Sequence, residues 1–220
     1  MAGTAAKLVP QQARSRESLR KLLKAGAEVL GQHGVEGTTI PRIARHAGLS
    51  PGALYRRFHD KDALLEAVVL GIMQRQDERV RVALTPGMAR QIPLAVFAEQ
   101  LIRSMLLSYR ASAGLLRAIR QFTQGRAHTA FYRKVVKLEF HTYRYLVELF
   151  LVRRREIKHP NPKRAVSFAL MMLASSLIEL ILVDQDMKNW QAIIPKDDQT
   201  LKRELLRAFL SYLGVEQKRN

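Results

Sequence analysis

Apolar residues recur three and four positions apart along most of the chain, which is the spacing of one face of an α-helix. Leu19, Leu22, Leu23, Gly26 and Leu30 form the first such series. No segment alternates apolar and polar residues between the turn residues of a hairpin, so the pattern predicts no β-strand. The sequence therefore predicts an all-α protein.

Turn-forming residues interrupt the helical pattern and divide the chain into about nine helices. The interruptions are residues 34–37, Gly48, residues 85–87, Gly125, residues 159–162 and residues 195–198. They predict three short helices, a connecting helix from residue 61 to about residue 82, and about five longer helices. Residues 1–14, which carry a proline and scattered charge, are expected to form a disordered arm.

One short helix is predicted between residues 38 and 47. Thr38 or Thr39 can cap its N-terminus, because a threonine hydroxyl accepts a hydrogen bond from a backbone N–H of the first turn. Pro41 falls in that turn, where a missing N–H costs little. The apolar residues of the helix share one face: Ile40, Ile43, Ala44 and Ala47.

A second short helix begins only a few residues later. Gly48 supplies the left-handed conformation that ends the preceding helix, and Leu49 can fill the corner. Ser50 is a good N-cap and Pro51 occupies the first helical position. Residues 38–57 therefore predict a helix-turn-helix.

The predicted exposed face of the second helix is small at its start and basic beyond it. Leu54 and Phe58 lie four residues apart and face inward. The outward residues are Pro51, Gly52, Ala53, Arg56 and Arg57, with Tyr55 at the flank. Small residues allow close approach to the major groove of DNA, and arginines reach phosphates or a guanine edge. Tyr55 and Lys61 offer further phosphate contacts. The alternative is a helical hairpin with a solvated basic face.

Charge and composition narrow the choice of partner. The formal net charge of +18 favours nucleic acid, an anionic membrane surface or an acidic small molecule. Residues 1–80 carry 13 Lys and Arg against 8 Asp and Glu, whereas the remainder carries a net charge of +13, so charge alone does not locate a DNA site. The absence of cysteine excludes disulfides and thiolate catalysis and fits the cytoplasm. Residues 168–183 are apolar, but Glu179 interrupts them and they are expected to fall short of a membrane span.

The stretch GTTIPRIARHAGLSPGALYRRFHDKDALLEAVV, preceded by SLRKLLKAGAEVLGQHG, resembles the DNA-binding domain of the TetR family of bacterial transcriptional regulators over about residues 15–75. The resemblance implies phosphate contacts from Thr39, Tyr55 and Lys61. It also implies groove or backbone contacts from Arg42, Ser50, Pro51, Gly52, Ala53, Arg56 and Arg57. Pro41 departs from the non-proline residue that is usual in the family.

In TetR-like proteins the remaining helices form a ligand-binding and dimerisation domain, which the resemblance assigns here to residues 76–220. Its last two long helices, at about residues 162–184 and 200–213, are then expected to pair with their copies in a homodimer. A face of small and apolar residues on the first of them fits close helix packing: Ala165, Ala169, Met172, Leu173, Ser176, Leu177 and Leu180. Burial of this face within one subunit is the alternative.

The same region is rich in aromatic and flexible apolar residues, and some are candidates for an effector pocket. The candidates are Phe97, Leu101, Met105, Tyr109, Leu116, Ile119, Phe122, Phe131, Phe140 and Tyr143, although each alone is more typical of a core. Glu179 is expected to face solvent or an arginine, with a cationic ligand as the alternative. A basic series either attracts an acidic effector such as an acyl-coenzyme A or forms a solvated face. It consists of Arg117, Arg120, Arg126, Arg133, Lys134 and Lys137.

Other classes of function fit the sequence less well. The six histidines show no metal-ligand spacing, and no phosphate-binding or dinucleotide fingerprint occurs, so neither enzyme, metal nor cofactor is expected. A constitutive DNA-architectural protein would not need roughly 130 further residues with so much apolar content. The resemblance implies a ligand-responsive transcriptional regulator that binds a palindromic operator as a homodimer. The resemblance implies a repressor released by a small apolar effector, neutral or acidic, with an activator as the alternative.

Overall fold

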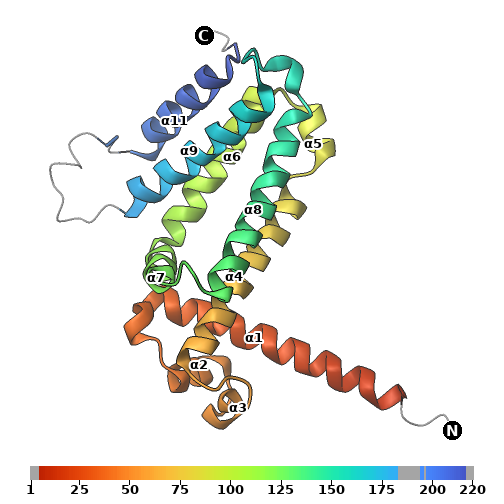
Figure 1. Ribbon diagram of the computed structural model, residues 1–220, viewed down its shortest axis with the longest axis vertical. Coiled ribbons are helices and arrows are strands. Elements are labelled where there is room, and N and C mark those ends of the chain that lie inside the picture. The colour runs from red at the N-terminus through yellow and green to blue at the C-terminus, as the bar shows by residue number, and fades with distance from the viewer. Residues whose placement is uncertain (1–4, 183–193, 196, 217–220) are drawn as a thin grey trace. The chain divides into compact units, whose positions relative to one another are not determined.

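The computed structural model describes residues 5–182, 194–195 and 197–216. These ranges contain ten α-helices and one 3-10 helix and no strand, which confirms the predicted all-α fold (Figure 1). The helices are α1 (Ala5–Gly37), α2 (Ile40–Ala47), α3 (Pro51–Tyr55), α4 (Lys61–Ala83), α5 (Pro86–Gln91), α6 (Leu94–Ala111), α7 (Ala113–Thr123), α8 (Ala130–Leu151), η1 (Arg154–Glu156), α9 (Pro162–Leu182) and α11 (Asp198–Leu213).

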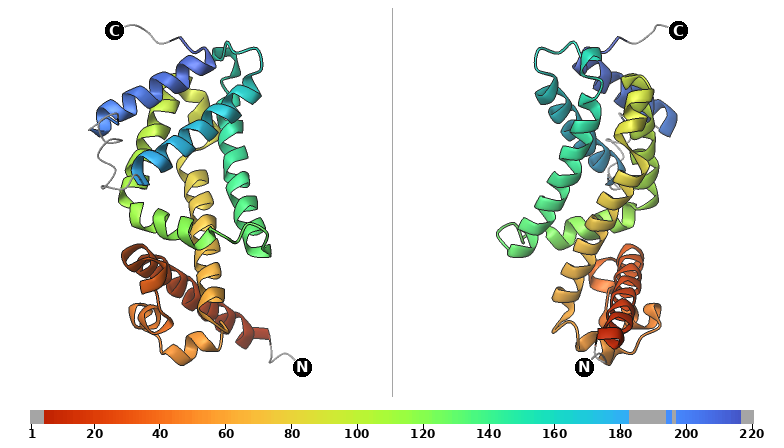
Figure 2. Two further views of the ribbon diagram at one scale, coloured as in Figure 1. Left: turned by 60° about the vertical axis from the view of Figure 1, so that its left-hand side comes forward. Right: turned by 90° about the vertical axis from the view of Figure 1, so that its right-hand side faces the viewer.

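The chain forms two compact units, and neither is one continuous segment. The first unit contains the residues up to Gln76 together with Gly114–Val136. The second contains Asp77–Ala113 and the residues from Lys137 onward. The sequence predicted one boundary near residue 75, whereas the structure assigns residues 114–136 to the first unit. Helix α4 is unbroken and contributes residues to both units (Figure 2).

A shared apolar core holds the first unit together, and α7 and the start of α8 take part in it. Gly26 lets α1 and α4 approach closely, since a Cβ there would lie 2.5 Å from Cγ2 of Val68. Phe122 of α7 meets Phe131 of α8 edge to face, with ring centroids 5.7 Å apart. The buried members of this core are Leu22, Val29, Leu30, Ile40, Ile43, Ala44, Leu54, Leu64, Leu65, Val68, Val69, Ala118, Phe122, Phe131 and Val135.

Helix α1 begins at Ala5, so residues 5–14 are helical where the sequence predicted a disordered arm. This segment contains three alanines and two glutamines, which are strong helix formers, together with Pro10, and it extends a helix whose later turns are anchored in the core. The regular part of α1 ends at Gly34, where φ is 64°. This kink coincides with the predicted interruption at residues 34–37.

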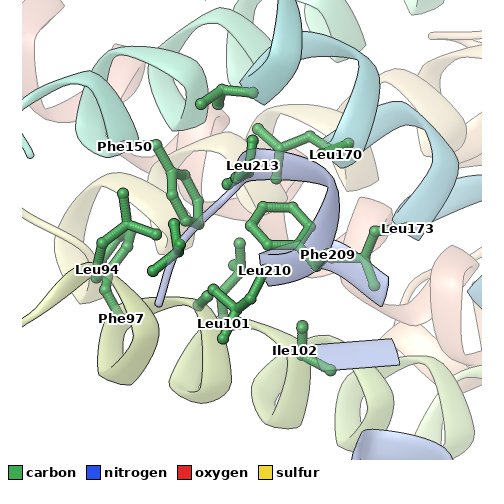
Figure 3. Packing of buried hydrophobic residues seen from close by; sticks show 14 of the residues in the cluster. Leu94, Phe97, Leu101, Ile102, Phe150, Leu170, Leu173, Phe209, Leu210 and Leu213 are labelled. Carbon is green, nitrogen blue, oxygen red and sulfur yellow. The ribbon is translucent and has the colours of Figure 1, made fainter. Parts of the chain in front are cut away.

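Helices α6, α9 and α11 pack against one another in the second unit, and α8 joins them through its C-terminal half. Phe150 of α8 lies between Phe97 of α6 and Phe209 of α11, with ring centroids 4.9 Å and 5.3 Å away (Figure 3). Aromatic pairs at these separations add to the stability that burial of their area provides. The core of the second unit is therefore centred on Phe150.

Helix α9 is long and apolar enough to cross a membrane by length and composition, with a mean hydropathy of 2.1. The sequence analysis expected residues 168–183 to fall short of a span, but the helix starts at Pro162 and has 21 residues. A buried core helix has the same composition, and α9 supplies seven buried residues to the second unit: Ala165, Val166, Ala169, Leu170, Leu173, Leu177 and Ile181. Packing within the second unit thus accounts for part of its apolar character.

The face of α9 that was predicted to pair with a second copy lies mostly inside the second unit. Its buried members, each with at most 4% of their area exposed, are Ala165, Ala169, Leu173 and Leu177. Met172, another member of the predicted face, is 37% exposed, and two apolar residues outside that face are exposed on the same helix, Phe168 at 42% and Met171 at 50%. Burial of these four residues within one subunit is the alternative that the sequence analysis left open, whereas pairing of α9 with a second copy stays a prediction.

Candidate DNA-binding site

Two threonines stabilise the turn before α2 and the start of that helix, and each forms a different hydrogen bond. The hydroxyl of Thr39 accepts a hydrogen bond from the backbone N–H of Arg42 at 3.3 Å, so Thr39 is the N-cap. Thr38 is fully buried, and its hydroxyl donates to the carbonyl of Gly34 at 2.6 Å. Thr38 therefore secures the turn at the end of α1, while Thr39 starts α2.

The turn between α2 and α3 has the conformation that the sequence predicts. Gly48 is left-handed, with φ 66° and ψ 33°, and the N–H of Leu49 donates to the carbonyl of Ala44 at 2.9 Å. The hydroxyl of Ser50 then accepts from the N–H of Ala53 at 3.3 Å and caps α3. The predicted helix-turn-helix geometry is confirmed.

Helix α3 buries one side chain and exposes most of the others. Leu54 is fully buried, and Phe58 is half-buried against the same core. Ala53, predicted to face outward, is half-buried. The exposed side chains of this segment are Pro51, Gly52, Tyr55, Arg56 and Arg57. The surface at the start of α3 is thus small, and it becomes basic at its end.

The arginines of this surface differ in their partners. Arg42 donates through Nη1 to the carbonyl of Gly37, and Arg57 donates through Nη2 to the hydroxyl of Ser15 at 3.4 Å. The backbone N–H of Arg56 donates to the carbonyl of Gly52 at 3.2 Å, but no described residue forms a hydrogen bond or ion pair with its guanidinium. Arg56 is therefore available to a ligand without losing a described contact, whereas Arg42 must first release Gly37.

The start of α4 is fixed next to this surface. Asp60 accepts through Oδ1 from the N–H of Ala63 at 2.7 Å and caps the helix. Asp62 pairs with Arg126, with Nη2 and Oδ2 2.9 Å apart. Lys61, predicted to contact phosphate, lies between Asp60 and Asp62 in the sequence and is half-buried. The positive charge of Lys61 therefore follows the recognition surface closely in the sequence.

The sequence analysis missed the packing of α7 on α1. A Cβ at Gly114 of α7 would lie 2.5 Å from the carbonyl oxygen of Gly31, so the two backbones are in direct contact. Arg126 also serves this part of the core, because its guanidinium lies 4.0 Å from the ring centroid of Phe122. The available signal was a pair of glycines inside helical patterns, which often marks close approach of two backbones.

The residues predicted to line an effector pocket do not form one cluster. Four of them belong to the first unit: Leu116, Ile119, Phe122 and Phe131. In the second unit Phe97 and Leu101 are buried in the core, and Phe140 is 59% exposed. The edge of that core has three half-buried candidates: Met105, Tyr109 and Tyr143.

An acidic side chain accompanies these three at the edge of the core. Glu139 of α8 is accessible to water, yet burial raises the pKa of its carboxyl. Burial also raises the pKa of Tyr109, and the nearby charge of Glu139 raises it further. Burial raises the pKa of Tyr143 as well. No described residue forms a hydrogen bond or ion pair with the carboxyl of Glu139.

A polar network joins the end of α4 to α8 within the second unit. Asp77 accepts from the hydroxyl of Thr142 at 2.8 Å and from Nε of Arg81 at 2.8 Å. The hydrogen bond from Arg81 is the main cause that lowers the pKa of Asp77. Arg81 also lies 4.4 Å from the ring centroid of Tyr145, whose hydroxyl donates to the carbonyl of Leu84 at 2.7 Å. We refer to these residues as the Asp77 network.

The basic series predicted around Gly125 is only partly a free surface. Arg126 is engaged as described above, and Arg133 donates through Nη1 to the carbonyl of His128 at 2.9 Å. Arg117, Lys134 and Lys137 are exposed. Within the described ranges no cluster of three or more His, Asp or Glu side chains is arranged to hold a metal ion.

Comparison with known proteins agrees with this geometry. The model of a family described as bacterial regulatory proteins, tetR family, matches residues 22–68, which contain the end of α1, all of α2 and α3, and the start of α4. The helix-turn-helix segment of the chain is thus similar to the TetR family. The resemblance that the sequence analysis drew from residues 15–75 is thereby confirmed.

Curated relatives match the same TetR-family domain. The transcriptional regulator UidR of Escherichia coli K12 is 29% identical over 70 residues, which are 32% of this chain and 36% of the relative. BetI of Cronobacter sakazakii is 36% identical over 67 residues, 30% of this chain and 33% of the relative. The match thus spans about a third of the relatives' length. Both relatives are named as transcriptional regulators.

The TetR-family fold extends over nearly the whole chain. A structure from Mesorhizobium loti, described as a TetR-family transcriptional regulator, has a TM-score of 0.69 at 21% identity and covers 90% of this chain and 97% of its own. FadR of Bacillus subtilis, solved in complex with stearoyl-CoA, has a TM-score of 0.62 at 17% identity and covers 87% and 97%. At these identities the likeness shows the fold of the second unit and leaves its ligand open.

Proposed function

We propose that the chain is a transcriptional repressor that acts in the cytoplasm, binds a palindromic operator as a homodimer, and is released from DNA by a small apolar effector. The observation that carries the proposal is the exposed start of α3, set by the left-handed turn at Gly48 and the cap at Ser50. In a helix-turn-helix this is the part of the second helix that enters the major groove.

Each residue of this surface has a role in the proposal. Gly52 and Ala53 permit the backbone to approach the base pairs, and Arg56 reaches a guanine edge or a phosphate. Ser50, Pro51, Arg42 and Arg57 contact the groove walls or the backbone. Thr39, Tyr55 and Lys61 contact phosphates, which position the protein without reading sequence.

Dimerisation is supported by an apolar patch that α9 and α11 share. Phe168, Met171 and Met172 are exposed on α9, and the ring of Tyr212 on α11 lies 5.5 Å from that of Phe168. Monomeric proteins rarely expose contiguous apolar surface of this kind. A second copy of the chain is the occupant we propose, because a palindromic operator requires two recognition helices.

The effector is assigned to the second unit, whose core edge supplies apolar and aromatic side chains. FadR, which shares the fold, is described with stearoyl-CoA, and Lys137 is an exposed cation of the second unit, so an acidic effector is one candidate class. Helix α4 connects the second unit to the recognition surface along the chain. A typical coupling of about 1–3 kcal/mol would change operator affinity by about 5- to 150-fold.

The test is a gel-shift titration with the DNA that flanks the protein's own gene. We expect Arg56→Ala to lose affinity mainly at one base pair, by about 1–3 kcal/mol, and Tyr55→Phe to lose affinity on all sequences alike. Arg117→Ala, which removes an exposed arginine of α7, is the matched control and should bind as the parent does.

Other outcomes assign other functions. Unchanged affinity in both α3 variants would contradict the recognition surface. Binding that ignores sequence and every ligand would indicate a DNA-architectural protein, and increased transcription from a reporter would indicate an activator. Stearoyl-CoA serves as the probe for the acidic class. By linkage, operator DNA must weaken the binding of stearoyl-CoA by the same factor by which stearoyl-CoA weakens the binding of DNA.

A further inference from the structure

Two carboxylates flank Lys61, the residue that the proposed function places against a DNA phosphate. Asp60 precedes it and Asp62 follows it, and both acidic residues are exposed. Like charges that lie close together repel, so an uncompensated carboxylate at either position would oppose the approach of a phosphate. The contact at Lys61 therefore depends on how the two carboxylates are compensated.

Asp60 has its partners close by in the sequence. Its Oδ1 accepts from the N–H of Ala63 at 2.7 Å, and its Oδ2 lies 2.9 Å from Nε2 of His59. Both oxygens of this carboxylate thus have a partner within three residues along the chain.

Asp62 has its partner in a distant segment. Its Oδ2 lies 2.9 Å from Nη2 of Arg126, which belongs to the turn between α7 and α8. No other cation among the described residues pairs with Asp62. Both residues belong to the first unit, so this ion pair closes a contact within one compact body.

Arg126 holds its position independently of Asp62. Its Nη1 donates to the carbonyl of Phe122 at 2.6 Å, and its guanidinium lies 4.0 Å from the centroid of the same ring. Phe122 is buried and meets Phe131 edge to face. A surface ion pair is usually weak because two long side chains must be ordered to form it. Here the arginine is already ordered by the core, and its side chain is only 28% exposed.

We propose that Arg126 neutralises the carboxylate of Asp62 and thereby permits Lys61 to contact a DNA phosphate, while Arg126 itself does not contact DNA. The inference rests on the proposed DNA-binding function and adds a positioning residue that lies outside the matched residues 22–68. Without Arg126, Asp62 presents a negative charge next to Lys61. Binding to every sequence is then weakened alike, because phosphate contacts do not read bases.

The test uses gel shifts at one low salt concentration, with the DNA that flanks the protein's own gene and with a duplex of unrelated sequence. Arg126→Met should weaken binding to both duplexes about fivefold, the upper end of what one exposed charge pair contributes. Asp62→Asn should bind at least as tightly as the parent, and adding it to Arg126→Met should restore the lost affinity. Arg133→Met is the control, because Arg133 bonds to the carbonyl of His128 and to no carboxylate, and it should bind as the parent does.

The order of the variants decides between the roles that Arg126 can have. Parental affinity in Arg126→Met would overturn the inference, and so would an equal loss in Arg133→Met. A loss in Asp62→Asn would overturn it as well, because the ion pair would then act as a structural link. A double variant that stays weak would assign Arg126 to a direct phosphate contact.

Two features keep the test decisive. Asp62→Asn leaves Arg126 on the ring of Phe122, so it tests the inference even where Arg126→Met folds poorly. A parent that binds both duplexes equally would contradict the operator-specific repressor, while the order of the variants would still decide this inference.

Discussion

At the scale of single residues, two glycines four positions apart in the helix-turn-helix have opposite requirements. Gly48 has a φ of 66°, which an L-residue adopts at a cost of roughly 1–2 kcal/mol, whereas Gly52 is helical and a Cβ there would meet nothing closer than 4.0 Å. We expect Gly48→Ala to lower the melting temperature and Gly52→Ala to preserve or raise it. Thermal unfolding followed by circular dichroism measures both. Equal melting temperatures would mean that the turn is not strained.

Asp77 is a second residue whose replacement has a defined effect. Asp77→Ala removes the acceptor of Thr142 and Arg81 and should cost about 1–3 kcal/mol of unfolding free energy at neutral pH, measured by urea denaturation. Glu78→Ala, at the exposed neighbouring position, should change little. An equal loss in both variants would contradict the network.

The Asp77 contribution also has a predictable pH dependence. The pKa of Asp77 is lowered from its ordinary value of 3.8, so its stabilising effect is complete above that pH and disappears as the pH falls through the lowered value. The difference in unfolding free energy between the parent and Asp77→Ala should therefore shrink under acidic conditions. A difference that stays constant with pH would mean that the charge of Asp77 has no part in it.

At the scale of elements, the contact between α1 and α7 governs the DNA-binding unit. Gly114→Ala would place a methyl group 2.5 Å from the carbonyl oxygen of Gly31, and overpacking of this kind costs about 1–3 kcal/mol. We expect this variant to unfold earlier and to lose DNA affinity in proportion. Gly87→Ala is the control, because its Cβ would meet only Thr85 Oγ1 at 3.8 Å. A stable Gly114→Ala variant would show that α7 is dispensable there.

A feature of these elements could be predicted from the sequence when it depends on residues that are close to one another in the chain. The caps at Thr39 and Ser50 and the turn at Gly48 depend on neighbouring residues alone, so residue types sufficed to place them. The docking of α7 joins residues more than 80 positions apart, at Gly31 and Gly114, and no local pattern specifies it. The apolar stripe of α9 could be predicted from the sequence, but whether it faces its own subunit or a second copy depends on tertiary packing.

At the scale of the whole molecule, the proposed dimer depends on the exposed patch of α9. Phe168→Glu should convert the protein to a monomer in light scattering and abolish tight binding to a palindromic site, because a charge in a buried interface lacks a partner. Phe140→Glu alters another exposed phenylalanine, on α8, and should leave the dimer intact. If both variants stay dimeric, the interface lies elsewhere; if both become monomeric, the patch on α9 is not specific.

The interruption of the DNA-binding unit along the chain has a consequence for its synthesis. The segment that completes its core, Gly114–Val136, is separated from the helix-turn-helix by Asp77–Ala113, which belong to the other unit. A nascent chain that has reached only α4 lacks Phe122 and Phe131 and leaves the apolar faces of α1 and α4 uncovered. Domains that consist of one N-terminal segment can fold while the ribosome is still translating the next. We therefore expect the recognition helix to acquire its full support only after α7 and the first turns of α8 have emerged from the ribosome.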